Sequence, residues 1–174
     1  MEILNILLRG IFGGVAAVGF GVLFNVPRRT LLHVFLLGAL SVMTKTIMME
    51  LNISISLASF TGAAAVGFLS LFAAHDKKSP PLVFAIPAVI PLVPGIFTYR
   101  MMTGLIRLTT ETGPQFNELF AQTVHNGLKA TFVIMALSVG VSVPHLLLRK
   151  ESFHEIISFS RVIKSFKKTG RKKR

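Results

Sequence analysis

The segment from Pro87 to Arg100 restricts the fold of this chain more than any other stretch, because it puts helix-breaking residues inside an apolar run. That run extends from about Leu82 to Ile106, long enough for a helix to cross a bilayer at about 1.5 Å per residue. Each proline in it lacks an N–H group and clashes with the carbonyl four residues earlier. The sequence therefore predicts a membrane helix that is broken part of the way along. The breaking residues are Pro87, Pro91, Pro94 and Gly95.

Such a break deprives backbone carbonyls of their usual helical partners, here those of Val83, Pro87 and Ile90. Carbonyls of this kind are tolerated at membrane depth only where they face protein or a water-filled cavity. Many transporters build their substrate sites from discontinuous helices. The alternative interpretation is a packing kink, since single prolines are tolerated in membrane helices. Three prolines with a following glycine favour the functional break.

The composition predicts a membrane protein with one domain. Hydrophobic residues make up 52% of the 174 residues and charged residues only 15%, whereas soluble domains carry about 25% charged residues. The absence of cysteine excludes disulfides, iron–sulfur clusters and thiol nucleophiles. The five histidines lack the paired spacing of a metal-binding helix, and the sequence contains no P-loop. We therefore expect no metal, no cofactor and no ATPase activity. An intramembrane enzyme is disfavoured because neither a Ser/His dyad at helical spacing nor an acidic metal cluster is evident, so we expect no enzymatic activity.

The chain is predicted to be an all-α integral membrane protein with about five transmembrane helices, the fourth of them broken. The expected helices cover residues 3–24, 30–49, 53–74, 82–108 and 116–148. We expect a transmembrane domain over residues 1–150 and a basic cytoplasmic tail over residues 151–174. Small residues recur every four positions in the first and third helices, a spacing that lets helices approach closely in lipid. They include Gly10, Gly14, Gly13, Ala17 and Gly21 in the first helix, and Ser59, Ala63 and Gly67 in the third.

The basic residues orient this array. With five crossings, the loops that carry Arg28, Arg29, Lys77 and Lys78 fall on the same side as the tail. The positive-inside rule then places the C-terminus in the cytoplasm and the N-terminus outside. A Lys/Arg-rich tail beside cytoplasmic helix ends suits anionic lipid rather than nucleic acid.

Two stretches carry family motifs. Residues 19–29 read GFGVLFNVPRR, with a GF…FNVP turn, and residues 87–99 read PAVIPLVPGIFTY, with a P…IP…PG…Y broken helix. Together they resemble the threonine/serine exporter (ThrE) family, and within it the small YjjB-like membrane subunits. The resemblance covers roughly residues 10–150 and leaves the tail outside.

The resemblance implies a five-helix half-transporter that acts with a separate, larger YjjP-like subunit, and export of threonine and serine or of succinate. We therefore expect a membrane subunit of a secondary exporter for small carboxylate-bearing metabolites. Association with further copies of the same chain stays open. The alternative is a non-transporting assembly or interaction protein whose prolines only shape packing. That alternative predicts a dry break, with Arg100 paired inside the protein.

The resemblance assigns no binding residue, so the site follows from residue chemistry. If Pro94 begins a second half-helix, the N–H groups of the next three residues point unsatisfied into the break. A helix N-terminus attracts anions, and nearby basic side chains add positive charge. These features favour a carboxylate. The predicted substrate-binding residues are Pro91, Pro94, Gly95, Ile96, Tyr99, Arg100 and Lys45.

Structural alternatives accompany three of these residues. In these alternatives, the Lys45 side chain extends toward the interface near Glu50, Arg100 binds the freed carbonyls, and Tyr99 anchors the helix at the interface.

Proton-coupled transport commonly uses a buried acid or histidine, and no Asp or Glu lies deep in a predicted crossing. The residues left for coupling are Glu50, His33 and His125; otherwise the coupling group belongs to the partner.

The predicted topology has a direct test, since the chain contains no cysteine of its own. Single cysteines introduced at Ser79 and Thr112 are expected to react with a membrane-impermeant thiol reagent from opposite sides. The cysteine-free parent provides the background. Labelling of both positions from one side contradicts five crossings.

Overall fold

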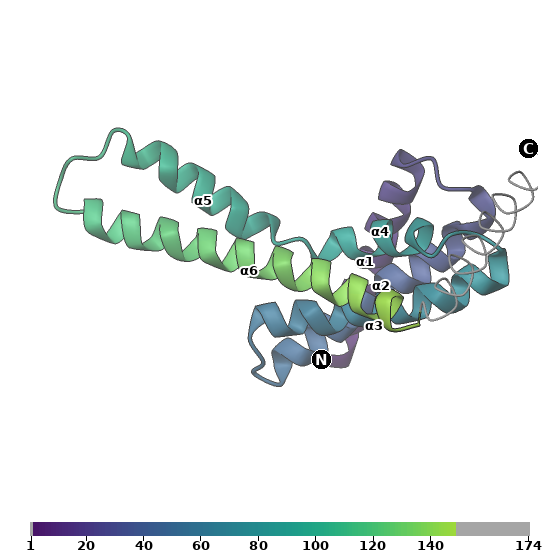
Figure 1. Cartoon of the computed structure of the whole chain (residues 1–174). Helices are drawn as coiled ribbons and strands as arrows, with labels where there is room; N and C mark the ends of the chain where they lie inside the picture. The colour runs from purple at the N-terminus through teal and green to yellow at the C-terminus, as the bar shows by residue number, and fades with distance from the viewer. Residues whose placement is uncertain (1, 149–174) are drawn as a thin grey trace, which may run out of the picture.

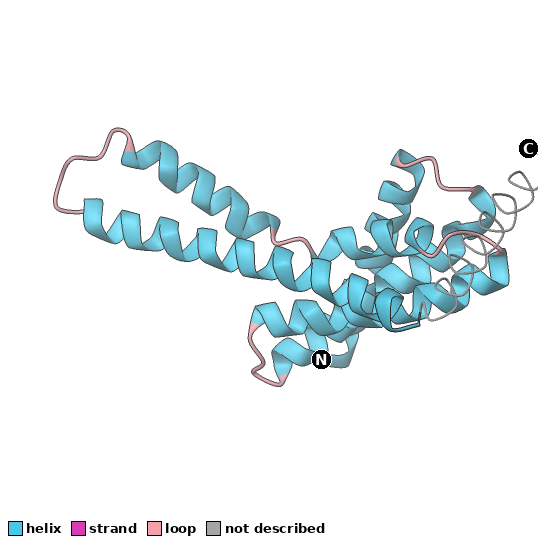
Figure 2. Ribbon diagram, viewed as in Figure 1, coloured by secondary structure: helices cyan, strands magenta, loops and turns pink. Residues whose placement is uncertain are grey.

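The computed structural model describes residues 2–148, and every regular element in that range is a helix (Figure 2). The elements are α1 (Glu2–Leu23), the 3-10 turn η1 (Arg28–Thr30), α2 (Leu31–Glu50), α3 (Ile55–Lys77), α4 (Leu82–Val89), the 3-10 turn η2 (Ile90–Leu92), α5 (Gly95–Leu108) and α6 (Phe116–Leu148). Four helices are each long and apolar enough to cross a membrane, and the bent pair formed by α4–η2 and α5 makes five if it counts as one span. The predicted all-α, multi-span architecture is confirmed. The predicted tail over residues 151–174 lies outside the described residues.

The predicted bounds of the unbroken helices agree with the structure to within three residues at each end. The predicted fourth helix is indeed divided, and the division lies at Val93 and Pro94. Pro87 does not end a helix, because it lies buried inside α4. A proline in the second turn of a short helix removes only one backbone hydrogen bond, which the surrounding bundle tolerates.

Small residues bring the long helices of the bundle together, as their spacing predicted. Gly13 of α1 lies against Val42 of α2, and Gly38 of α2 lies against the fully buried Ala17. In α3, Gly67 lies so close to α6 that an added Cβ would be 2.8 Å from the carbonyl oxygen of Val141. These contacts rest on backbone approach rather than on large side chains, as is usual for helices packed in lipid.

The short helix α4 forms the centre of the bundle. Its residues Phe84, Ala85 and Ala88 are fully buried, and they belong to one apolar cluster with Val34 of α2 and Val66 of α3. Helix α4 contacts α1, α2 and α3. The first half of the broken helix is therefore enclosed by protein.

The second half leaves this bundle. Helix α5 and the first part of α6 run side by side and project away from α1–α4 (Figure 1). We call this projection, α5 with residues 116–129 of α6, the arm. The later part of α6 packs against α3, so α6 joins the arm to the bundle.

The contact between α3 and α6 gives a stability prediction. Replacing Gly67 with alanine forces the helices apart and is expected to destabilise the protein by about 1–3 kcal/mol, the usual penalty for overpacking. Gly19 is the matched control, since an added Cβ there meets nothing within 4 Å. Gly19→Ala is expected to be neutral or slightly stabilising because alanine favours helix. The midpoint of thermal unfolding in detergent measures both, and equal midpoints for the two variants contradict the prediction.

Candidate functional site

The broken helix is the first part of the candidate site. Helix α4 continues into η2 up to Leu92, and α5 begins at Gly95. The axis of residues 82–92 and the axis of α5 differ by 55°. Between them, Val93 is extended (φ −56°, ψ 135°) and Pro94 has φ −81° and ψ 58°. The latter values are those of an inverse γ-turn.

Most backbone groups at the break are satisfied locally. The Val93 N–H donates to the Ile90 carbonyl at 3.0 Å, and the Gly95 N–H donates to the Val93 carbonyl at 2.9 Å. The Phe97 N–H donates to the Pro94 carbonyl at 3.1 Å. The prediction of three unsatisfied N–H groups was therefore wrong for Gly95 and Phe97. The tight turn around Pro94 folds the backbone onto itself, which sequence position alone does not indicate.

Two side chains of α2 approach carbonyls at the end of the first half-helix. The Lys45 ammonium donates to the Leu92 carbonyl at 3.2 Å. The buried Ser41 hydroxyl bonds to the Gly38 carbonyl of its own helix at 2.7 Å and lies 3.1 Å from the Ala88 carbonyl. Gly62 of α3 completes this junction, because a Cβ there would lie 2.8 Å from both the Leu92 side chain and the Ser41 carbonyl oxygen. Lys45 thus points into the bundle instead of toward Glu50. It takes the role that the alternative interpretation gave to Arg100.

The structure distributes the predicted substrate-binding residues over three places. Pro91, Pro94 and Lys45 lie at the break, where Pro94 is buried and Gly95 borders open space. Ile96 and Tyr99 lie on α5, and each of these two residues is more than half exposed. Arg100 lines a cavity on the arm, beyond the break.

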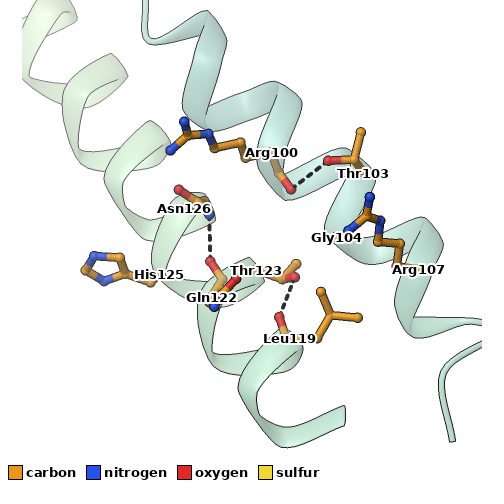
Figure 3. A pocket seen from close by; sticks show the side chains of 9 residues that line it. All are labelled: Arg100, Thr103, Gly104, Arg107, Leu119, Gln122, Thr123, His125 and Asn126. Carbon is orange, nitrogen blue, oxygen red and sulfur yellow. Dashed lines mark hydrogen bonds between the residues drawn. The ribbon is translucent and has the colours of Figure 1, made fainter. Parts of the chain in front are cut away.

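That cavity is the second part of the candidate site. It has a volume of about 400 Å³ and lies between α5 and α6 (Figure 3). The lining residues are Arg100, Thr103, Gly104, Arg107, Leu119, Gln122, Thr123, His125 and Asn126. Gly104 lets the two helices meet at the cavity floor, since a Cβ there would collide with Thr123.

The cavity is basic. The small polar side chains around it bond to their own helices: Thr123 donates to the Leu119 carbonyl at 2.7 Å, and Asn126 donates to the Gln122 carbonyl at 2.8 Å (Figure 3). In the described part of the chain, neither Arg100 nor Arg107 forms a salt bridge. Two guanidinium groups therefore line the cavity with their donors available, and an anion is the ligand that such groups prefer.

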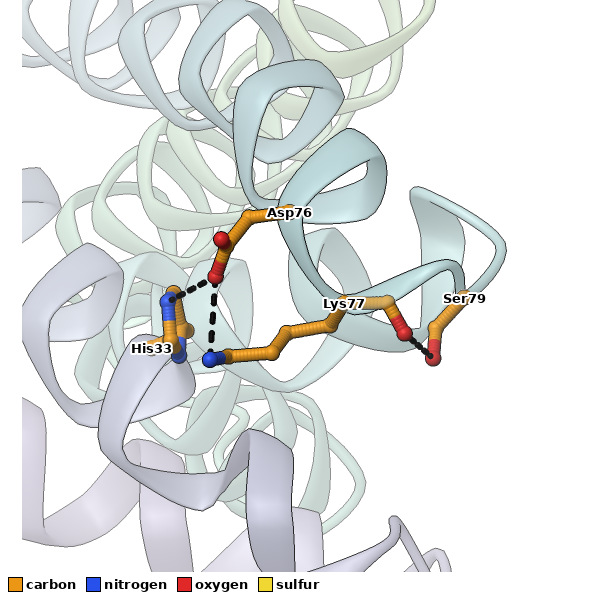
Figure 4. A network of polar contacts seen from close by, with 4 residues as sticks. All are labelled: His33, Asp76, Lys77 and Ser79. Carbon is orange, nitrogen blue, oxygen red and sulfur yellow. Dashed lines mark hydrogen bonds and ion pairs between the residues drawn. The ribbon is translucent and has the colours of Figure 1, made fainter.

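The three predicted coupling residues lie apart from one another. Glu50 is exposed at the end of α2, and His125 lines the cavity. His33 lies 3.5 Å from the Asp76 carboxylate, which also binds the Lys77 ammonium at 3.0 Å (Figure 4). The predicted third helix ended at residue 74, whereas in the structure α3 continues to Lys77, so Asp76 lies in its last turn, beside the start of α2.

Several cavity residues were missed from the sequence. The predicted site did not include Arg107, Thr103, Gln122 or Thr123. Their spacing was the available signal. Arg100, Thr103, Gly104 and Arg107 follow the i, i+3, i+4, i+7 pattern of one helix face, and so do Leu119, Gln122, Thr123 and Asn126.

Comparison with known proteins gives a family and a distant relative. A family model described as "Threonine/Serine exporter, ThrE" matches residues 9–147. A curated relative from Haemophilus influenzae, described as "Uncharacterized protein", is 29% identical over 148 residues, which are 85% of this chain and 49% of the relative. The chain therefore spans about half the length of that relative. No solved structure matches the chain.

The bond from Lys45 to the break gives a second stability prediction. Lys45→Met keeps the length of the side chain and removes the donor to the Leu92 carbonyl. Leaving a partly buried carbonyl unsatisfied is expected to destabilise the protein by about 1–3 kcal/mol. The control is the neighbouring Thr44→Val, whose hydroxyl bonds only to the Leu40 carbonyl of its own helix. Thermal unfolding in detergent compares the two variants, and a parental midpoint for Lys45→Met shows that the bond contributes nothing.

Proposed function

Because this chain belongs to the threonine/serine exporter (ThrE) family, we propose that it is a membrane subunit of a secondary exporter for small metabolites that carry a carboxylate. The substrate class includes threonine and serine, and succinate as a dicarboxylate. The basic cavity on the arm carries this proposal, because it holds two arginines whose guanidinium groups form no salt bridge in the described residues. Arginine binds carboxylates through two parallel hydrogen bonds.

Further cations support a route for an anion along the arm. The Lys129 ammonium lies 5.5 Å from the ring centroid of Phe97 at the start of α5, whereas the Lys45 ammonium is already bonded to the Leu92 carbonyl. Arg100 and Arg107 follow along α5. A row of like charges that leads from the bundle outward favours an anionic solute at each step.

We propose that transport needs a second, larger YjjP-like subunit. The chain covers 49% of the Haemophilus influenzae relative, so the remaining half of such a relative is available for that role. Within the described residues, the acidic group nearest a histidine is Asp76, and Lys77 already pairs with it. In this proposal the partner supplies the coupling group, and the assembly lies in a bacterial plasma membrane with the N-terminus outside.

The packing-kink alternative keeps one observation in its favour. The Lys45 ammonium satisfies the Leu92 carbonyl at the break, as expected for a dry junction. It also predicted Arg100 paired inside the protein, and no such salt bridge occurs among the described residues. The break has a structural role under both interpretations. The cavity is therefore the site that distinguishes an exporter subunit from a non-transporting assembly protein.

The cavity test is a transport measurement on Arg100→Gln. Loss of a charged hydrogen bond weakens binding by about 1.5–3 kcal/mol, so export is expected to fall roughly tenfold or more at limiting substrate. Dicarboxylates should be affected more than zwitterionic amino acids. Arg29→Gln, in the η1 turn, is the control for a lost arginine. Gly95→Leu adds a side chain in open space and should reduce export without a folding defect. If Arg100→Gln and Gly95→Leu both insert and export at the parental rate, the substrate site lies elsewhere.

A further inference from the structure

A groove between α2 and α3 is apolar along its walls and polar at one end. Its volume is about 410 Å³. Side chains of both helices form the walls, among them Leu36, Leu40 and Phe72, and Phe72 is 60% exposed. His33 and Asp76 line the polar end. From His33 to Leu40 the groove follows two turns of α2, about 10 Å, so a ligand that fits it must be polar at one end and apolar beyond.

The polar end of the groove lies at the end of two membrane-spanning helices. His33 belongs to the first turn of α2 and Asp76 to the last turn of α3, and each helix is long and apolar enough to cross a membrane. Basic residues come next in both connections, Arg29 before α2 and Lys78 after α3. The polar end is therefore at the level of the lipid headgroups, and the apolar walls extend into the hydrocarbon core.

The carboxylate of Asp76 is held through one of its two oxygens. Its Oδ2 atom lies 3.0 Å from the Lys77 ammonium and 3.5 Å from Nε2 of His33 (Figure 4). The His33 ring is fixed in turn, because it packs edge-on against the fully buried Phe84 of α4 with 6.0 Å between the ring centroids. Among the residues that the structure describes, none bonds to Oδ1, and the Asp76 side chain is 61% exposed. Oδ1 is thus available to a donor in the groove.

The charges at this end select the headgroup. Asp76 and Lys77 form a pair of opposite charges, and Lys78 adds a second ammonium beside it. A headgroup with both an ammonium and a phosphate complements this arrangement, since each of its charges meets one of opposite sign. A phosphate without an ammonium would bring negative charge to Asp76. A choline headgroup has the positive charge but no N–H to donate to Oδ1.

We propose that this groove is a binding site for a bilayer phospholipid of the phosphatidylethanolamine type. The ammonium of the headgroup donates to Oδ1 of Asp76, and the phosphate faces Lys77 and Lys78. One acyl chain lies along the walls at Leu36 and Phe72. The site is separate from the basic cavity of the arm, and the proposal does not depend on the proposed export function.

The test is competition for a photoreactive lipid on the delipidated full chain in detergent. The probe is phosphatidylethanolamine with a diazirine in one acyl chain, and its adducts are mapped by mass spectrometry. Unlabelled phosphatidylethanolamine should reduce the adducts on α2 and α3. Its N-methyl and N,N-dimethyl derivatives should do the same, because each keeps an N–H. Phosphatidylcholine and phosphatidylglycerol with the same acyl chains should compete roughly fivefold less well or worse, as expected for loss of one charged hydrogen bond. Equal competition by either lipid overturns the proposal, as does a competed adduct that maps outside α2 and α3.

Two variants then assign the headgroup preference to one carboxylate. Asp76→Asn keeps the shape of the side chain and removes its charge, so phosphatidylethanolamine and phosphatidylcholine should compete almost equally. Glu50→Gln is the matched control, because Glu50 is an exposed acid at the opposite end of α2, and it should keep the parental ratio. The midpoint of thermal unfolding shows whether Asp76→Asn is folded; if it is not, the headgroup series on the parental chain decides. A parental ratio in folded Asp76→Asn, or an equal loss in Glu50→Gln, overturns the proposal.

Discussion

The bond between the Lys45 ammonium and the Leu92 carbonyl lets this chain interrupt a helix inside a packed bundle. A carbonyl at such a position must find a donor, because hydrocarbon offers none. Helix α2 supplies this donor through Lys45, and one turn earlier the Ser41 hydroxyl, which bonds to the Gly38 carbonyl at 2.7 Å, lies 3.1 Å from the Ala88 carbonyl. Gly62 of α3 must be small for the same reason, since a larger residue would separate α3 from this junction. Residues of α2, α3 and the first half-helix therefore meet at this one break.

The rest of the architecture follows from the direction in which the chain leaves that break. The 55° bend carries α5 out of the bundle, and α6 must then be long enough to return along it. The resulting arm separates the apolar packing of α1–α4 from the basic cavity. Arginines that would be costly to place in the bundle lie at its outer end instead. One turn at Val93 and Pro94 therefore sets both the shape of the molecule and the location of its charge.

The sequence predicted those features that depend on local pattern. Helix bounds, the divided fourth helix and the packing of Gly13 and Gly67 all follow from spacing and from proline chemistry. What failed was the choice of partners between distant segments. Lys45 and Leu92 are 47 residues apart, so nothing local indicates that Lys45 and not Arg100 would bind the break. The cavity was predictable only in part. The spacing of Arg100 and Arg107 indicates a polar helix face, but the packing of that face against α6 depends on the bend.

The two halves of the broken helix are held by different means, and this bears on where a solute can bind. The first half is fixed by side chains, since Lys45 binds the Leu92 carbonyl and Phe84 is fully buried. The start of the second half is shaped by the backbone turn at Pro94, while Gly95 next to it borders open space. A carboxylate at the first half would have to displace bonds that already satisfy the backbone. At the arm the arginine donors carry no carboxylate in the described residues, so binding there replaces only water. The break is therefore better suited to positioning the arm, and the cavity to recognising an anion.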